Sequence, residues 1–167
     1  MDKQSLRNLF TYHYWANRRL WRSIMALSDA QFTQPLSDGG PSIQAQVVGM
    51  VANENLWVNY LWHNEVEFLN ESYLPTRASI RAEWDGLEEE MRDFIDVLTP
   101  IELVTQVDPE FMKLDAPMRV WEILAQIVDQ AAEHRTHLCC DLNDLGSPVP
   151  DRDIDDIMVT HWYAIPA

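Results

Sequence analysis

Basic residues are scarce in this chain. Of its 167 residues, 12 are Lys or Arg and 27 are Asp or Glu, so the formal net charge is −15. Affinity for nucleic acid depends on Lys and Arg side chains that neutralise phosphates, and no dense cluster of these residues occurs in the sequence. The composition therefore argues against a nucleic-acid partner.

Cysteines and long apolar runs are also scarce. The only two cysteines, Cys139 and Cys140, are adjacent, and neighbouring residues rarely reach disulfide geometry without strain. No stretch approaches the roughly 18 uncharged apolar residues of a membrane span. Polar residues also interrupt residues 1–10, where a secretory signal needs an apolar run. We therefore expect a cytoplasmic protein with no membrane contact.

Apolar residues make up 47% of the chain, which is enough for a core, and they recur at helical spacing. Steps of three and four residues predict helices over residues 5–27, 42–63, 79–98 and 119–145. Residues 103–117 lose this period, and Asp108-Pro109 signals a turn. The pattern predicts an all-α four-helix bundle with a short irregular or hairpin-like connection before the fourth helix.

Local signals mark the ends of these helices. Ser42 is a typical N-cap for the second helix, and Gly146 is a typical residue just beyond the end of the fourth. Ser28-Asp29 and Thr99-Pro100 are expected to end the first and third helices. We expect a single domain over residues 1–150 and an acidic tail over residues 151–167, with a short helix at 154–159 as one alternative for the tail.

The last predicted helix carries a polar stripe beside its apolar face. Gln126, Gln130 and His134 are spaced by four residues, and His137 continues the stripe, so these side chains lie along one face. Helix borders are commonly polar, and the stripe then contacts only solvent. The alternative is that it directs polar groups into a cleft.

Five segments resemble the DinB/YfiT-like superfamily: residues 14–20 (YWANRRL), residues 42–45 (SIQA), Glu54 with Trp57, residues 121–124 (WEIL) followed by His134-Arg135, and residues 145–148 (LGSP). They occur in order over nearly the whole chain. The resemblance implies a four-helix bundle that is commonly homodimeric. It also implies a zinc or nickel site of three histidines, one on the second helix and two on the fourth. Imidazole suits these ions.

The chain departs from that pattern at two of the three ligand positions. Gly49 occupies the position on the second helix, Gln130 occupies the first position on the fourth, and only His134 remains. Glycine has no donor atom, and an amide oxygen is a weak ligand for these ions. We therefore expect the site to be dismantled and no cofactor to be bound; any cofactor would be a divalent metal such as zinc or nickel. A rebuilt site would use His134 with His137 and Glu54.

Side chains near the first helix could also contribute. His13 could approach a rebuilt site, although its aromatic neighbours favour a packing role. Arg135 points about 100° away from His134 around the helix, toward the apolar stripe. We expect it either to pair with a buried acid such as Glu54 or to contact a ligand. Because the chain is so acidic, an anionic ligand would need Arg135, Arg18 or Arg19 nearby.

Three functions remain open from the sequence. The favoured one is a non-catalytic, stress-related module that binds either a small molecule or another protein, and Gln126, Gln130, His134 and His137 would line the pocket for a small molecule. The second, implied by the resemblance, is a metal-dependent thiol S-transferase or hydrolase-type enzyme with a rearranged metal site. The third is metal-free catalysis with His134 as a general base. The sequence identifies no catalytic residue beyond these alternatives.

Overall fold

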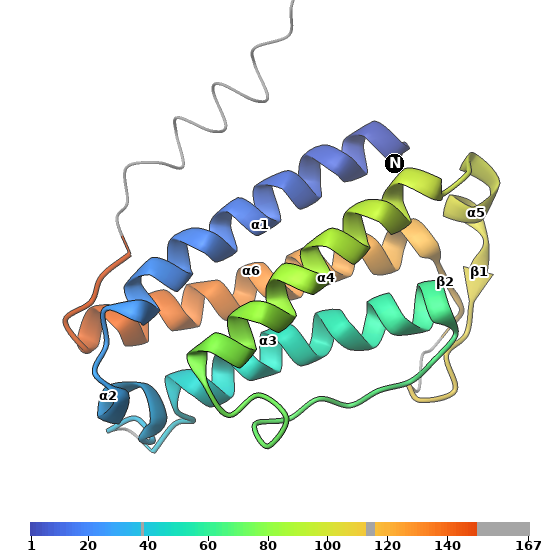
Figure 1. The fold of residues 1–167 in the computed structure, drawn as a ribbon. Coiled ribbons are helices and arrows are strands. Elements are labelled where there is room, and N and C mark those ends of the chain that lie inside the picture. The colour runs from blue at the N-terminus through green and yellow to red at the C-terminus, as the bar shows by residue number, and fades with distance from the viewer. Residues whose placement is uncertain (38, 113–115, 150–167) are drawn as a thin grey trace, which may run out of the picture.

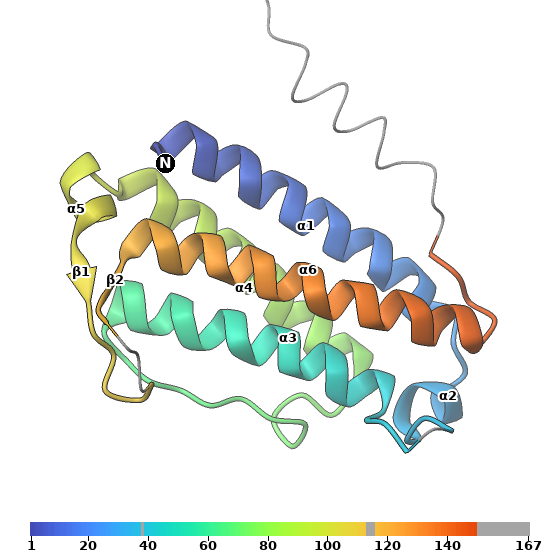
Figure 2. The ribbon, with the colours of Figure 1, turned by 180° about the vertical axis from the view of Figure 1, so that it is seen from behind.

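Four long helices form the body of the protein. The computed structural model describes residues 1–37, 39–112 and 116–149. The helices are α1 (Lys3–Met25), α3 (Ile43–Val58), α4 (Arg77–Val97) and α6 (Val120–Asp144), and they run alongside one another as a bundle (Figures 1 and 2). The predicted all-α four-helix bundle is confirmed, and each long helix lies on one of the four predicted segments.

Side-chain caps explain where three of these helices begin. The side chains of Asp2, Ser42 and Thr76 each accept a hydrogen bond from the backbone N–H three residues further on. Such a cap satisfies one of the N–H groups that the first helical turn leaves without a partner. The predicted role of Ser42 is therefore confirmed.

Two short helices lie where the sequence predicted only breaks: α2 (Asp29–Thr33) and α5 (Pro100–Val104). Ser28 and Thr99 each start a new turn through a capping box. Pro100 follows at the first helical position, where its missing N–H costs nothing. The residues that end one helical pattern thus begin the next helix. In addition, α3 continues into a π-helical turn, η1 (Asn59–His63), which stops at Asn64 with a φ of 55°.

A minimal hairpin precedes α6, as predicted. Strand β1 (Gln106–Val107) pairs antiparallel with β2 (Met118–Arg119), and Gln106 lies opposite Arg119. Residues 113–115 of this connection lie outside the described residues. So do the acidic tail of residues 151–167 and its helical alternative at 154–159, and the domain boundary at residue 150 stays a prediction.

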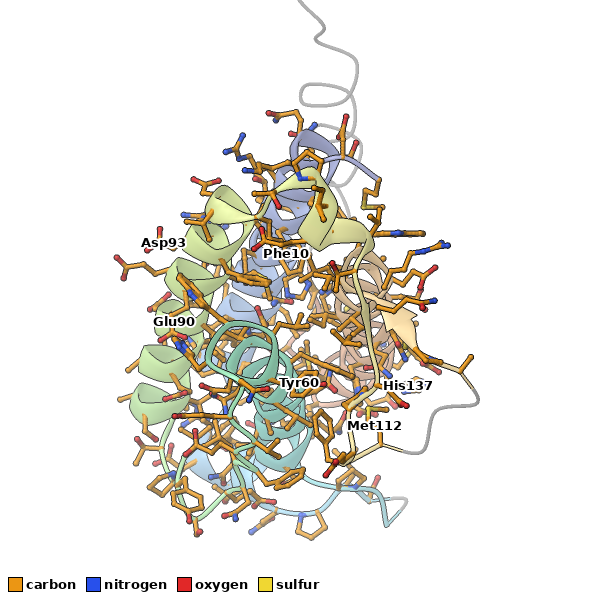
Figure 3. All side chains as sticks on the ribbon, turned by 90° about the vertical axis from the view of Figure 1, so that its right-hand side faces the viewer. Phe10, Tyr60, Glu90, Asp93, Met112 and His137 are labelled. Atoms are coloured by element: carbon orange, nitrogen blue, oxygen red, sulfur yellow. The ribbon has the colours of Figure 1, made fainter. Side chains whose placement is uncertain are left out.

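The position of α6 determines which side chains can form a site. It lies against α1 on one side and α3 on the other, while α4 covers the opposite side of the bundle against the same two helices. Phe10 lies between the helices, whereas Glu90 and Asp93 lie on the outer side of α4 (Figure 3). The largest fully buried side chains are Leu6, Phe10, Tyr14, Leu20, Ile24, Ile43, Ile80, Met91, Ile95, Ile123, Leu124 and Ile127.

The C-terminal end of α6 turns back onto α1. Gly146 adopts a φ of 77°, which favours glycine. Its N–H bonds to the carbonyl of Asn143 and the next N–H bonds to that of Leu142, so the helix ends in a Schellman motif. Ser147 Oγ then donates to the carbonyl of Ser23 at 2.8 Å. The predicted role of Gly146 is confirmed, and this contact positions residues 147–149 against α1.

None of the helices within the described residues is long and apolar enough for a membrane span.

Candidate functional site

The polar stripe of α6 lies on the border that this helix shares with α3. Gln130 and Gln126 are half-buried, whereas His134 and His137 are exposed. Gln130 Oε1 accepts a 3.1 Å hydrogen bond from Asn53 Nδ2 on α3. Gln126 Oε1 is buried and has no hydrogen-bond partner among the described residues. The stripe is therefore partly solvated and partly bonded across to the neighbouring helix.

The three positions that the resemblance assigned to metal ligands do not fit a zinc or nickel ion. Gly49 offers no donor and is exposed, with open space where a Cβ would stand. The side-chain oxygen of Gln130 already accepts from Asn53. Within residues 1–37, 39–112 and 116–149, no three His, Cys, Asp or Glu side chains gather in a group that could hold a metal ion. His134 would be left as the single imidazole donor.

The side chains considered for a rebuilt site also differ in burial. Glu54 is 3% exposed and belongs to the interior, whereas His134 and His137 lie on the surface of α6. Glu54 and His134 line the same small cavity of about 10 Å³, but His137 does not. That volume is close to the space of a single water molecule. The cleft that the resemblance would assign to metal and substrate is therefore almost closed.

The buried polar groups form a network between α1, α3 and α6 instead. Tyr14 donates to Glu54 Oε1 at 2.5 Å, and the other oxygen of Glu54 lies 3.4 Å from Nε2 of His13. Arg135 Nη1 donates to Asn17 Oδ1 at 2.9 Å and lies 3.2 Å from Nδ1 of His13. All five side chains are less than 9% exposed. The network thus crosslinks three of the four long helices.

The ring of His13 has a polar neighbour at each nitrogen. Nδ1 lies 3.2 Å from Nη1 of Arg135, and Nε2 lies 3.1 Å from Nδ2 of Asn17 and 3.4 Å from Oε2 of Glu54. His13 therefore stands between the carboxylate and Arg135. The expected direct pair of Arg135 with Glu54 is wrong, because the imidazole occupies the space between them. The expected packing role of His13 is also incomplete, since its ring nitrogens take part in the network.

Tyr14 stays protonated in this environment. Burial raises the pKa of its hydroxyl well above the ordinary value, and the negative charge of Glu54 raises it further. The hydroxyl is consequently a permanent donor to the carboxylate. Neither Tyr14 nor Asn17 was predicted from the sequence to have a role. Their spacing from His13 along α1 was the one available signal, because residues 13 and 17 share a helix face.

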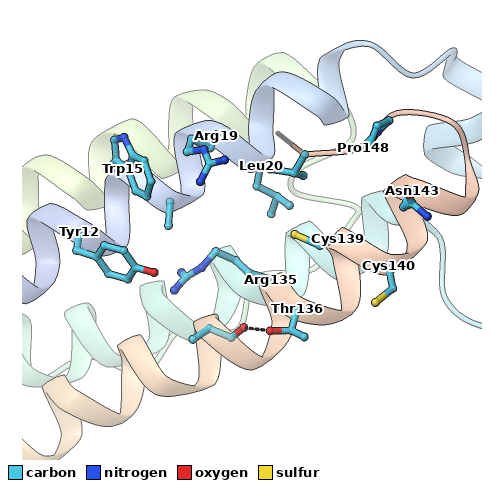
Figure 4. Close-up of a pocket in the computed structure, with 13 residues that line it drawn as sticks. Tyr12, Trp15, Arg19, Leu20, Arg135, Thr136, Cys139, Cys140, Asn143 and Pro148 are labelled. Atoms are coloured by element: carbon cyan, nitrogen blue, oxygen red, sulfur yellow. Dashed lines mark hydrogen bonds between the residues drawn. The ribbon is translucent and has the colours of Figure 1, made fainter. Parts of the chain in front are cut away.

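A groove of about 480 Å³ lies between α1 and α6. Side chains from both helices line it, together with Pro148 and Val149 from the segment that follows α6 (Figure 4). Its lining residues are Tyr12, Trp15, Ala16, Arg19, Leu20, Ala132, Arg135, Thr136, Cys139, Cys140, Asn143, Pro148 and Val149. Apart from Arg135 and Arg19, sequence analysis did not connect these residues with a ligand.

Two features shape this groove chemically. The guanidinium of Arg19 lies 4.8 Å from the centre of the Trp15 ring, a cation–π contact that holds both side chains in place. Tyr12 and Arg135 point toward one another from α1 and α6 (Figure 4). Burial lowers the pKa of Arg135, because its charge is partly removed from water. The groove therefore combines aromatic walls with fixed positive charge.

The model of a family described as the DinB family matches residues 1–163. No curated protein matches the chain.

Proposed function

Because the chain belongs to the DinB family, we propose that it is a small-molecule binding member whose ligand occupies the groove between α1 and α6. One observation carries this proposal. The groove measures about 480 Å³, whereas the cavity beside His134 measures about 10 Å³. Ligand pockets typically span about 300–1,000 Å³, so the groove has the volume for a ligand and the cavity does not.

The donor chemistry at the α3–α6 border supports a function without metal. Gly49 has no donor, and a hydrogen bond between Asn53 and Gln130 joins the two helices there. We therefore expect neither zinc nor nickel to bind tightly. Metal-free catalysis with His134 as a general base is not favoured either, because no hydrogen-bond partner among the described residues orients its ring.

A metal-dependent S-transferase or hydrolase with a rearranged site is the competing function. It requires His134, His137 and Glu54 to converge on one ion. Glu54 would have to leave Tyr14 and His13, and its carboxylate would have to move toward the surface of α6. That rearrangement costs the hydrogen bonds of the buried network, and no contact of the described residues favours it.

Three further expectations accompany the proposal. We propose a homodimer, a cytoplasmic location and a stress-related role, all of which rest on the sequence and its resemblance. Sedimentation velocity of the purified chain tests the dimer. Protein abundance after oxidative or DNA-damaging treatment tests the stress-related role, and fractionation of cells tests the location.

A fragment screen followed by ¹⁵N-labelled NMR tests the binding proposal. We expect the resonances that shift to cluster at residues 12–20 and 132–143, along the groove. Ala132→Trp should abolish the shifts by filling the groove. Ala78→Trp is the matched control, because it adds the same ring to an exposed position of α4. Shifts that cluster at Gly49, Gln130 and His134, or no binding at all, would overturn the proposal.

A further inference from the structure

We infer that the ligand of this groove is a small organic acid whose carboxylate binds to Arg135. The inference rests on the proposed function, since it concerns the same groove, and it adds the chemical class of the ligand. Three independent features of the described residues support it: the charge of the lining, the hydrogen-bonding state of Arg135, and the apolar walls.

The described lining of the groove differs in composition from the rest of the chain. The protein has 27 acidic and 12 basic residues, yet the described residues that line the groove include two arginines and no Asp or Glu. The positive charge of Arg135 in this lining attracts an anion despite the overall negative charge.

Arg135 has donors left for a ligand. It is 8% exposed, and both of its hydrogen bonds within the described residues use Nη1. Nε and Nη2 therefore have no partner there. Neither nitrogen is among the buried side-chain atoms that lack a partner, so both keep some contact with solvent, and Arg135 lines the groove.

The geometry of the free donors suits a carboxylate. Nε–H and one N–H of Nη2 point in parallel from one edge of the guanidinium, and a carboxylate can accept both at once. The network holds the other edge, because Nη1 is bonded to Asn17 and His13. The orientation of the free edge is thus set before a ligand arrives, which reduces the entropic cost of binding.

The rest of the ligand meets apolar surface. Trp15, Leu20 and Val149 line the groove together with alanines from both helices. The ring of Trp15 is held by Arg19, so it offers a fixed face for an aromatic or aliphatic body. A purely ionic ligand would leave the apolar surface of the groove exposed to water. A neutral apolar ligand would leave the donors of Arg135 without a partner. An acid with an apolar body satisfies both.

Acid and amide pairs with the same apolar body test this inference. We would measure dissociation constants by calorimetry for the full chain with 2-naphthoate, 3-phenylpropionate and octanoate, and with the three corresponding primary amides. We expect the best acid to bind at least about tenfold more tightly than its amide. Arg135→Gln should remove this preference. Arg7→Gln should keep it, because it removes one positive charge from α1 at a residue that pairs with Asp96, outside the groove.

Each remaining outcome is decisive. Equal binding of acids and amides in the natural sequence would overturn the inference and leave the proposed function standing, and this comparison needs no variant to fold. Binding of none of the six probes would overturn both. A preference for the acid that persists in a folded Arg135→Gln protein would overturn the role of Arg135. Arg135→Lys should keep the charge but weaken the preference, since an ammonium lacks the two parallel donors.

Discussion

The hydroxyl of Tyr14 on α1 donates a 2.5 Å hydrogen bond to Oε1 of Glu54 on α3, and both side chains are buried. A buried carboxylate is costly unless its oxygens have partners. Tyr14 supplies the shortest of these contacts, and His13 lies 3.4 Å from the second oxygen. The pair therefore stabilises the only acidic member of the network that joins α1, α3 and α6.

Removal of the Tyr14 hydroxyl should destabilise the protein. We expect Tyr14→Phe to lower the free energy of unfolding by about 1–3 kcal/mol, because Glu54 then keeps a buried oxygen without its donor. Urea unfolding at neutral pH measures the change. Tyr73→Phe, at an exposed tyrosine, is the control and should have almost no effect.

The same hydroxyl should make stability depend on alkaline pH. The pKa of Tyr14 is raised in the folded protein by burial and by Glu54, so the folded state holds this proton more tightly than the unfolded state. Its contribution to stability is complete below the unfolded pKa of 10.0 and is lost as the pH rises above that value. Between about pH 8 and about pH 11, the natural sequence should lose more stability than Tyr14→Phe. An equal loss would contradict the assignment.

Two substitutions should create a metal site. In Gly49→His/Gln130→His, imidazoles occupy all three positions that the resemblance assigns to ligands, with His134 as the third. We expect zinc to bind this variant at least about 100-fold more tightly than the natural sequence, and to raise its unfolding midpoint. Calorimetry and thermal unfolding, with and without a chelator, measure both effects.

The matched control for this variant is Gly86→His/Gln130→His. An added Cβ at Gly86 on α4 meets open space, as it does at Gly49, so the two variants differ in the place of one histidine. Equal zinc affinities would show that the backbone of the cleft has changed as well as its ligands. The chelator should leave the unfolding midpoint of the natural sequence unchanged.

The hydrogen bond between Asn53 and Gln130 should contribute to the contact of α3 with α6. A double-mutant cycle of Asn53→Ala and Gln130→Ala should give a coupling energy of about 0.5–1.5 kcal/mol. Gln126 makes no hydrogen bond with Asn53 among the described residues, so a cycle of Asn53→Ala with Gln126→Ala should give a coupling near zero. Similar couplings in the two cycles would argue against the bond.

Glu88 should stabilise the contact of α1 with α4. Its carboxylate lies 2.6 Å from Nη1 of Arg18 on α1 and 2.5 Å from Nη2 of Arg92 on α4. Because both arginines are about half exposed, solvent screens the pair, and we expect Glu88→Gln to cost only about 1–2 kcal/mol. Unfolding in denaturant measures this. The control is Glu89→Gln at the exposed neighbouring residue, which should change the free energy of unfolding very little.

Helix ends were predictable because their signals are local. Ser42 caps α3 and Gly146 ends α6 through hydrogen bonds within a few residues, so the residue types were sufficient. The same locality explains the two missed helices. Ser28 and Thr99 were interpreted as breaks, but each also bonds to the residue three positions later. A helix of five residues is too short to be recognised from the spacing of its apolar residues.

The sequence by itself determined the helical bundle and the residue types at the positions that the resemblance assigns to metal ligands, since helical periodicity and the absence of an imidazole at Gly49 and Gln130 are properties of single segments. Only the tertiary structure decided that His13 stands between Glu54 and Arg135, and that a groove of about 480 Å³ lies between α1 and α6. Residues 12–20 and 132–149 are more than a hundred positions apart, and helical periodicity does not say which helices become neighbours. The packing of the side chains determines which helices are neighbours, and it therefore also determines the surroundings of Arg135.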